Sequence, residues 1–465
     1  MLNMVWFRRD LRIEDNPALS AACQRATAGV IALFIMTPET WLEHGMAPIQ
    51  TAFLLENLRT LSTALKKKNI PLLIREVPAF KNIPALLENL IQSFKVEGIF
   101  CNRQYEWDER QRDLAVKQKL KKLDCRYYEF DDQVIIPPDK ILNQQGEPFK
   151  VFTPYKRKWL SLAETLYSIP LSSPKQQMKF SIESDVIPEA SKNFLLPTAG
   201  ERAAEKRLIT FCQKSISHYH ISRDFPAKNA TSHLSADLAL GILSPRQCLS
   251  RVMFEEKIVT FNDFFNKTGA AVWVSELIWR EFYKMILFQF PRVSRSKAFQ
   301  LKTDKIPWRH DEKSFKKWCE GMTGFPLVDA AMRQLNETGW MHNRLRMLTA
   351  MFLTKILLID WRWGERYFST HLIDWDLSAN NGGWQWSAST GTDAVPYFRI
   401  FNPITQSERF DPNGDFIRQF CPELIDLDSK VIHDPHGYGL KVQYPLKMVD
   451  YKQARLRTLE AFKRL

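Results

Sequence analysis

The sequence lacks the features that define several large protein classes. Its seven cysteines are scattered and include no CxxC pair, which argues against a disulfide framework and against a cysteine zinc site. No stretch approaches the roughly 20 apolar residues that a membrane helix needs. The first residues do not form a signal peptide, because their short apolar run is followed directly by charges. We therefore expect a soluble, cytoplasmic protein.

Several catalytic and metal-binding motifs are missing as well. No GxGxxG follows the first apolar stretch, so a classical dinucleotide site is not predicted. Residues 387–391 lack the first glycine of a GxSxG nucleophile elbow. The spacing of His371, Asp374 and Asp376 matches no metal site that we can justify. Residues 411–415 resemble a calcium loop but have no glycine at its sixth position, so we predict a turn there and no metal.

Positive charge and tryptophan are the two components in excess. The net charge is +13 and the sequence pI is about 9.3, which favours a polyanionic partner such as nucleic acid or an anionic membrane face. The 465 residues correspond to two or three domains of about 100–200 residues each. The tryptophans concentrate in the C-terminal half, where they occupy positions 273, 279, 308, 318, 340, 361, 363, 375, 384 and 386.

Residues 1–130 alternate buried strands with amphipathic helices. This alternation predicts a Rossmann-like α/β domain with a doubly wound, parallel, five-stranded sheet. The predicted strands are residues 2–7, 30–36, 70–77, 98–102 and 126–130, and the predicted helices lie near 15–26, 49–68, 82–95 and 106–123. Ligands of such sheets lie beyond the carboxyl ends of the strands. Polar residues after the first and fourth strands are Arg8, Arg9, Asp10, Asn16, Asn102, Arg103, Tyr105, Glu106, Asp108 and Glu109.

The rest of the chain is predicted to form a connector and an all-helical domain. Residues 131–197 lose the alternation and become rich in Pro, Ser and Lys, which is typical of an inter-domain connector on the surface. Strand signals are few in residues 198–465, and Ser244-Pro245 has the pattern of a helix N-cap followed by proline. Helices are predicted at 200–215, 271–290, 311–320, 324–338, 341–359, 364–371 and 446–465.

Residues 371–403 are the most unusual stretch. They combine acids, amides, paired glycines (Gly382 and Gly383) and several tryptophans. Buried polar groups are costly unless they are paired, glycine lets the backbone approach a ligand, and tryptophan stacks on flat rings. One interpretation is the wall of a site for a planar, polar, aromatic cofactor. The other is a glycine turn between two core helices.

Two predicted helices carry mixed polar and aromatic faces. Trp273, Glu276, Trp279 and Arg280 share roughly one helical face, as do Asn343, Arg346 and Met347 on a later helix, where Arg344 points elsewhere and could meet a phosphate. The first face could stack an apolar ring and offer it one hydrogen bond, or it could be a core in which Glu276 pairs with an arginine. The second could equally be a surface helix with capped arginines.

A loop rich in hydroxyl groups precedes these helices. It follows Arg223 and contains Thr231, Ser232, Leu234 and Ser235. Hydroxyls and backbone N–H groups in such loops can hold phosphates. The commoner alternative is Ser/Thr capping of the next helix.

Taken together, these segments resemble the DNA photolyase/cryptochrome family, and most closely the bacterial class I cyclobutane pyrimidine dimer photolyases. The resemblance runs from the first strand to the last helix. It is carried by residues 5–12, 276–283, 324–333, 338–347 and 371–403.

The resemblance implies an N-terminal antenna domain and a C-terminal domain that binds FAD in a U-shaped conformation. It also implies light-driven electron transfer from reduced flavin to a pyrimidine dimer in DNA. The positions that match the family's FAD site are Tyr219, Thr231, Ser232, Leu234 and Ser235 at the phosphates, Arg346, Asp374, Asp376 and Asn380 around the isoalloxazine ring, and Trp273 and Arg280. Asp374 is expected to form an ion pair with Arg346.

The same resemblance assigns further roles. Trp384, Trp361 and Trp308 match the tryptophan chain that reduces the flavin. Glu276, Trp279, Asn343, Met347 and Trp386 match the pocket for the flipped-out dimer, and Arg223 and Arg344 match contacts to DNA phosphates. His44, Asp108, Glu109 and Arg295 correspond to a site for a 5,10-methenyltetrahydrofolate antenna. We expect a monomer with no metal and no membrane partner.

A few positions separate functions within the family. Asn380 is the photolyase choice near flavin N5, and Met347 stands where (6–4) photolyases carry a catalytic histidine. These choices favour dimer repair over the alternatives, which are a (6–4) photolyase and a cryptochrome-type photoreceptor without repair activity. Three residues depart from the pattern: Trp375 replaces a small residue, Asp108 an asparagine and Arg295 a lysine.

Overall fold

The computed structural model describes residues 1–179, 181–191, 193–266 and 268–465. The chain forms two compact units. The first comprises Met1–Ser217 and Ser232–Pro291, and the second comprises His218–Thr231 and Arg292–Leu465. This division runs through the predicted helical domain, so the domain limits at residues 130 and 197 stay a prediction.

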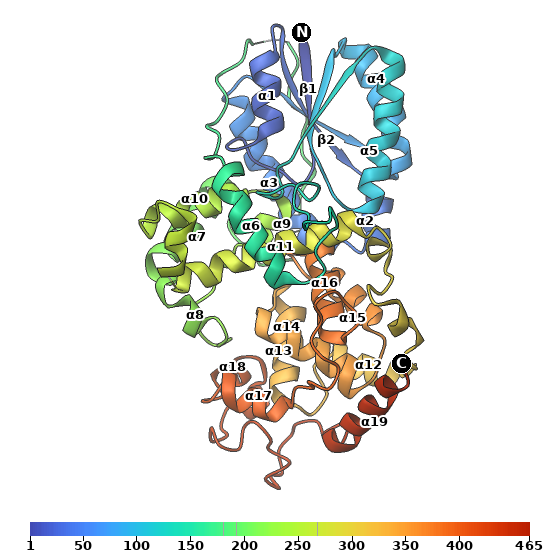
Figure 1. Cartoon of the computed structure of the whole chain (residues 1–465), viewed down its shortest axis with the longest axis vertical. Coiled ribbons are helices and arrows are strands. Elements are labelled where there is room, and N and C mark those ends of the chain that lie inside the picture. The colour runs from blue at the N-terminus through green and yellow to red at the C-terminus, as the bar shows by residue number, and fades with distance from the viewer. Residues whose placement is uncertain (180, 192, 267) are drawn as a thin grey trace. The chain divides into compact units, whose positions relative to one another are not determined.

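The first unit contains the predicted parallel sheet (Figure 1). Its described strands are β1 (Leu2–Phe7), β2 (Gly29–Met36), β3 (Leu72–Glu76), β4 (Gly98–Asn102) and β5 (Arg126–Phe130). They lie in the order β3-β2-β1-β4-β5, and the β1–β2 register runs from Leu2 opposite Gly29 to Phe7 opposite Phe34. Because β1 and β2 are apolar along nearly their whole length, they pair at the buried centre of the sheet. The α/β fold class is confirmed.

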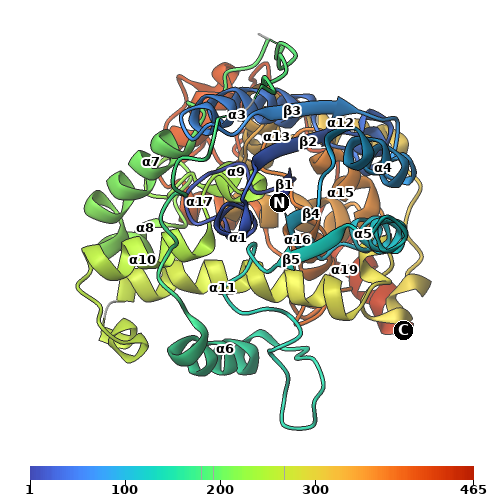
Figure 2. The same cartoon turned by 90° about the horizontal axis from the view of Figure 1, so that it is seen from above.

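Helices cover both faces of this sheet, with α1 and α3 on one side and α4 and α5 on the other (Figure 2). Met4 and Trp6 of β1 pack with Leu87 of α4 and Val116 of α5 in one apolar cluster. The helices of the unit are α1 (Pro17–Arg25), α2 (Pro38–His44), α3 (Pro48–Lys66), α4 (Ile83–Phe94), α5 (Trp107–Leu120), α6 (Phe152–Leu166), α7 (Glu201–Lys214), α9 (Ser235–Leu240), α10 (Pro245–Glu255) and α11 (Thr268–Gln289). The N-cap predicted at Ser244 is confirmed, because its hydroxyl accepts a hydrogen bond from Gln247 N.

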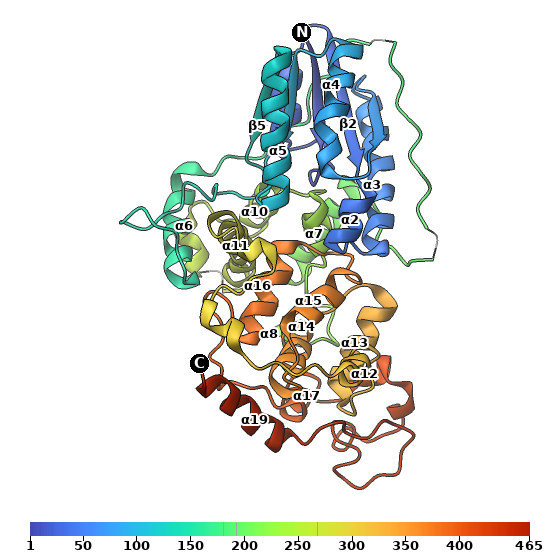
Figure 3. The same ribbon diagram turned by 90° about the vertical axis from the view of Figure 1, so that its right-hand side faces the viewer.

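The connector is more structured than predicted, since it contains α6. Its later part runs as an extended segment along the first unit (Figure 3). There, Ser184 Oγ and Asp185 Oδ2 accept hydrogen bonds from the backbone N–H groups of Leu72 and Ile74, at 2.9 and 2.8 Å. These side chains therefore satisfy N–H groups at the exposed edge of β3.

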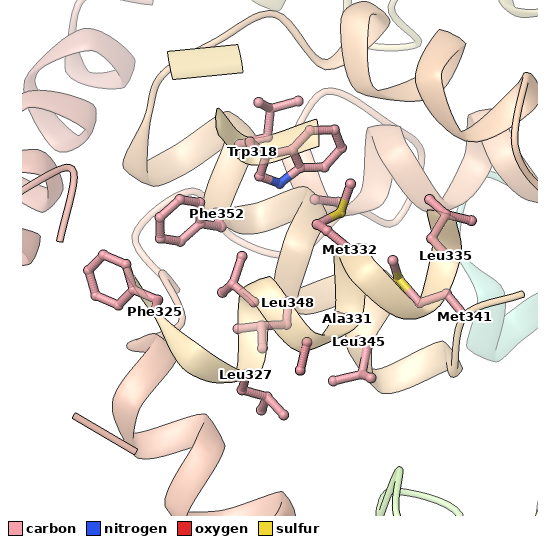
Figure 4. Packing of buried hydrophobic residues seen from close by; sticks show 14 of the residues in the cluster. Trp318, Phe325, Leu327, Ala331, Met332, Leu335, Met341, Leu345, Leu348 and Phe352 are labelled. Carbon is pink, nitrogen blue, oxygen red and sulfur yellow. The ribbon is translucent and has the colours of Figure 1, made fainter. Parts of the chain in front are cut away.

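The second unit is helical in its described residues. Trp318 and Phe325 join side chains of α13 and α14, among them Met332 and Leu345, in its apolar core (Figure 4). The helices of the unit are α8 (Tyr219–Ser222), α12 (Glu312–Cys319), α13 (Pro326–Thr338), α14 (Asn343–Met351), α15 (Trp361–Ser369), α16 (Leu377–Ala388), α17 (Pro403–Phe410), α18 (Asp415–Phe420) and α19 (Tyr451–Lys463). None of the helices in the described ranges of either unit has the length and apolar character to cross a membrane.

Two predictions for this unit were wrong. The glycine turn proposed as an alternative for residues 371–403 does not exist, because Gly382 and Gly383 lie inside α16. The single helix predicted over 341–359 is instead α14 followed by a π-helical turn at Phe352–Ile356. In contrast, residues 411–415 do form a turn, in which Asp411 accepts hydrogen bonds from the N–H groups of Phe416 and Ile417.

Candidate functional site

The second unit contains a cavity between α14, α16 and the loop before α16. These two helices lie side by side (Figure 1). Seven of the residues predicted to form the site line this cavity: Asn343, Arg346, Met347, Asp374, Asp376, Asn380 and Trp384. The shared face predicted for Asn343, Arg346 and Met347 is therefore confirmed. Trp386 is half-buried on α16 and does not line the described part of the cavity.

An ion pair forms one side of the cavity. Arg346 Nη2 donates to Asp374 Oδ2 at 2.7 Å, and Arg346 Nε donates to Met341 O at 2.9 Å. The Asp374 side chain is only 1% exposed. Burying a carboxylate without a partner is costly, and Arg346 supplies the partner here. The predicted pairing of Asp374 with Arg346 is confirmed.

Two groups orient the start of α16. Asp376 is the N-cap, and its carboxylate accepts hydrogen bonds from Ala379 N and Ser378 Oγ. The Asn380 amide nitrogen donates to the backbone oxygen of Glu365, on α15, at 3.0 Å. With its nitrogen held this way, the Asn380 amide is fixed beside the cavity.

Sequence reasoning missed Glu365. Its carboxylate accepts a hydrogen bond from Asn381 Nδ2 at 2.9 Å, and burial raises the pKa of Glu365 to about 7. The Glu365 side chain therefore holds Asn381, the neighbour of Asn380 on α16, while the Glu365 backbone oxygen holds Asn380 itself. The sequence signal that could have identified Glu365 is its position four residues after Trp361, because residues four apart lie on the same face of a helix.

The cavity lining leaves space and unsatisfied polar atoms for a polar ligand. A Cβ built on Gly383, which lines the cavity, would meet no atom within 4 Å, so this interior helix position opens into free space. Asp374 Oδ1 and Ser387 Oγ are buried in the lining and have no hydrogen-bond partner among the described residues. Buried polar atoms normally have partners, and a ligand with polar edges would provide them here.

The three tryptophans predicted to carry electrons differ in burial. Trp384 lines the cavity and is 2% exposed, Trp361 is fully buried, and Trp308 is half-buried at the margin of the core. The ring of Trp384 packs against Gly364 of α15, where a Cβ would lie 2.1 Å from Trp384 Cη2. Trp308 is thus the most exposed of the three, and the resemblance assigns it the outer end of the chain.

Arg223 and Arg344 converge on one acid. Arg344 Nη2 lies 2.7 Å from Asp224 Oδ1, and Arg223 Nε lies 3.9 Å from the same oxygen. The guanidinium groups also sit over aromatic rings, Arg344 over Phe410 and Arg223 over Tyr219. The two arginines therefore form one cationic group in the second unit. Both side chains are half-buried and do not extend fully into solvent.

In the first unit, α11 carries the other mixed face. Trp279 stacks on Phe152 of α6 with ring centroids 3.6 Å apart, and Trp273 is buried against Phe211. Glu276 is half-buried, and Lys156 donates to Oγ of the adjacent Ser275 at 3.2 Å. Burial lowers the pKa of Lys156, and the charge of Glu276 opposes this shift. Arg280 donates to the backbone oxygens of Gln133 and Leu238.

The hydroxyl-rich loop is divided between the two units. Tyr219 is buried and Thr231 half-buried in the second unit, whereas Ser232 precedes α9 in the first unit. Leu234 is the buried N-cap residue of α9 and Ser235 its exposed first residue.

Three of the four predicted antenna residues meet in the first unit. His44 Nε2 lies 3.1 Å from Asp108 Oδ2, and His44 Nδ1 lies 3.9 Å from Glu109 Oε1. Burial opposes a positive charge on His44, but the hydrogen bond to Asp108 and the charge of Glu109 raise its pKa overall. Arg295 is exposed in the second unit.

The carboxyl ends of β1 and β4 are occupied by internal pairs. Arg8 Nη1 lies 2.6 Å from Asp113 Oδ2, and Asn102 Nδ2 donates to Asp10 Oδ2 at 2.6 Å. These polar groups satisfy one another instead of lining a nucleotide pocket. The described ranges contain no group of three or more His, Cys, Asp or Glu side chains that could hold a metal ion.

Comparison with known families gives two matches along the chain. Residues 3–175 match the family described as DNA photolyase, and residues 273–464 match the family described as FAD binding domain of DNA photolyase. The second match contains the whole cavity of the second unit.

Individual relatives match over the full length. The chain is 47% identical to the deoxyribodipyrimidine photo-lyase of Salmonella typhimurium, covering 99% of this chain and 98% of the relative. The crystal structure of a class III photolyase from Agrobacterium tumefaciens matches with a TM-score of 0.88 and 36% identity, covering 99% and 97% of the two chains. The cryptochrome of Synechocystis sp. PCC6803 matches with a TM-score of 0.86 and 27% identity, covering 99% of each chain.

Proposed function

The chain belongs to the DNA photolyase family, and from this premise we propose that it is a deoxyribodipyrimidine photo-lyase, which repairs cyclobutane pyrimidine dimers in DNA. The observation that carries the proposal is the cavity of the second unit. It lies within the FAD-binding match, and it offers an ion pair, an open glycine face and partnerless polar atoms to a flat polar ring.

FAD, when it is bound in the reduced form and excited by light, supplies the electron that splits the cyclobutane ring and takes it back afterwards. Arg346, Asp374 and Asp376 would hold the edge of its ring system, and Asn380 would face N5 in an orientation set by Glu365. The family resemblance adds Tyr219, Thr231, Ser232, Leu234 and Ser235 at the phosphates, and Trp273 and Arg280 as further contacts.

The tryptophans would have separate tasks in this proposal. Trp384 would be the donor in the cavity wall, Trp361 the relay in the core, and Trp308 the outer member of the chain, and their burial supports this order. These residues would serve to reduce the flavin and would not be needed for repair once it is reduced.

DNA binding would rest on charge and on aromatic stacking. Arg223 and Arg344 would contact backbone phosphates, supported by the net charge of +13. Trp279 and Trp386 would stack on the flipped-out dimer, and Asn343 and Met347 would contact its bases. Glu276 would hydrogen-bond the dimer and stabilise the charge that develops on it.

An antenna site and a monomeric state complete the proposal. The cluster of His44, Asp108 and Glu109 supports a folate site in the first unit, to which the resemblance adds Arg295. The protein acts as a monomer, without a metal or a membrane partner.

The assignment of Glu276 is tested by Glu276→Ala in blue light on an oligonucleotide with one cyclobutane dimer. We expect a large loss of repair with an unchanged FAD content, because the side chain acts on the dimer. The matched control is Glu189→Ala, at an exposed glutamate of the connector. Repair at the full rate by Glu276→Ala would remove Glu276 from the mechanism.

A second candidate function is a flavin photoreceptor without repair activity. The similarity to the Synechocystis cryptochrome favours it, although the identity of 27% is lower than the 47% to the photo-lyase relative. Oligonucleotides with a cyclobutane dimer, a (6–4) lesion or no lesion separate the candidates. Repair of the first alone supports our proposal, repair of the second alone indicates a (6–4) photolyase, and repair of neither by flavin-loaded protein indicates the photoreceptor.

A further inference from the structure

We propose that Trp375 is a second primary electron donor to the flavin, in addition to Trp384. This inference rests on the proposed function, because it requires FAD in the cavity of the second unit. Trp375 lies in the cavity wall but does not belong to the chain of Trp384, Trp361 and Trp308, so the proposal gives it a redox role of its own.

Both indoles belong to the same cavity. Trp375 and Trp384 line it together with Asp374, Asp376 and Asn380. Both are almost fully buried, with 4% and 2% of their surface exposed, and both belong to the apolar core of the unit. A ring that fills this cavity would therefore be close to two indoles, and neither indole would be screened from it by bulk water.

The chain around Trp375 is held on both sides. On one side, Asp374 is fixed by its 2.7 Å ion pair with Arg346. On the other, Asp376 caps α16 and accepts a hydrogen bond from Ala379 N. With both neighbours fixed and its own side chain buried, Trp375 cannot swing out of the cavity wall without disturbing the ion pair or the helix cap. A donor needs this kind of fixed distance to its acceptor to react at a constant rate.

The chemistry is a one-electron transfer. One electron leaves the Trp375 indole, which becomes a radical cation, and enters the excited oxidised flavin ring. No covalent bond breaks and no proton has to move in this step. The excited flavin is the oxidant, and light supplies the energy.

A cavity with two donors makes a distinctive prediction. Removing Trp384 alone leaves Trp375 in place, so the excited state of oxidised flavin remains strongly quenched. Only the loss of both indoles restores long-lived emission. With Trp384 as the sole donor in the cavity, its removal alone would restore that emission.

The experiment measures flavin fluorescence lifetime and picosecond transient absorption in proteins loaded with oxidised FAD. The variants are Trp384→Phe, Trp375→Phe and the double variant, with Trp363→Phe as a control at a half-buried tryptophan on α15 outside the described cavity lining. We expect both single variants and the control to stay quenched, with an indole radical cation signal, and the double variant to emit several-fold more strongly. Equal emission from Trp384→Phe and the double variant would overturn the proposal.

Two further outcomes have defined meanings. If Trp375→Phe loses FAD, the Trp384→Phe variant still decides the question, because its Trp375 is intact. Long-lived flavin emission from Trp384→Phe refutes the proposal. Quenched emission with an indole radical in that variant supports the proposal. If even the unaltered protein binds no FAD, the proposed function fails and the inference fails with it. Bound FAD together with unquenched Trp384→Phe refutes the inference alone.

Discussion

Gly383→Ala should stabilise the flavin-free protein and at the same time weaken its binding of FAD. Glycine in the interior of a helix costs about 0.5–1 kcal/mol relative to alanine. The added methyl group would meet no atom within 4 Å, so no packing penalty offsets this gain. For a domain of 150–250 residues, each kcal/mol shifts the melting temperature by about 2–4 °C. We therefore expect the flavin-free variant to melt about 1–4 °C higher.

The same methyl group would project into the space that we assign to the flavin ring. Each tenfold loss of affinity removes about 1.4 kcal/mol from the stabilisation that FAD provides. The assay is thermal melting with and without added FAD, in which the FAD-induced rise should shrink in the variant. The control is Gly364→Ala, where a Cβ would lie 2.1 Å from Trp384 Cη2 and should destabilise both forms. An FAD-induced rise as large as in the unaltered protein would refute our assignment of the cavity.

Three other predictions concern the same unit. Arg346→Met should lower the free energy of unfolding by about 2–3 kcal/mol, because buried Asp374 loses its partner. The partial exposure of Arg346 keeps this loss below that of a fully buried pair. An unchanged urea midpoint of the flavin-free protein would contradict this prediction. Trp308→Phe should block photoreduction of oxidised flavin but spare repair by protein reduced beforehand, and unchanged photoreduction would exclude Trp308 from the electron path. Lys355 is fully buried, and burial lowers its pKa from 10.5 to about 7. Between these pH values the unfolded state binds a proton at Lys355 that the folded state does not. The free energy of unfolding therefore rises with pH in this range and falls as the pH drops toward 7. Lys355→Met should remove this slope and stabilise the protein at pH 7, and parallel urea midpoints of variant and parent from pH 7 to 9 would refute the assignment.

The sheet was predictable because its signals are local. Buried parallel strands are continuous apolar runs, and β2 has this pattern throughout, as does β1 except at Asn3. Helix limits set by caps were also within reach, as Ser244 illustrates. In these elements the local residues alone indicate whether a strand is buried and where a helix begins.

The cavity was only partly predictable. The face shared by Asn343, Arg346 and Met347 follows from helical periodicity, and the pairing of Arg346 with Asp374 followed from the family resemblance. Gly383 inside α16 was not predictable, because intrinsic propensity disfavours glycine in helices, and here the packing of α14, α15 and α16 overrides that preference. The contribution of Glu365 depends on two helices meeting, which no local pattern reports.

The limits of the compact units show the same dependence on packing. The connector contains α6, whose Phe152 stacks on Trp279 of α11, and this contact joins segments more than a hundred residues apart. A composition rich in Pro, Ser and Lys describes the second part of the connector well, but it does not report that long-range contact. Boundaries of this kind depend on tertiary packing rather than on local sequence.

The most direct test of the central claim uses an oligonucleotide that contains a single thymine dimer. The protein is reduced chemically, mixed with the oligonucleotide, and either illuminated with blue light or kept in the dark before chromatography. Our account predicts that intact thymines return only in the illuminated sample. Failure to recover thymines in the light, by protein that holds reduced FAD and binds the oligonucleotide, would contradict it.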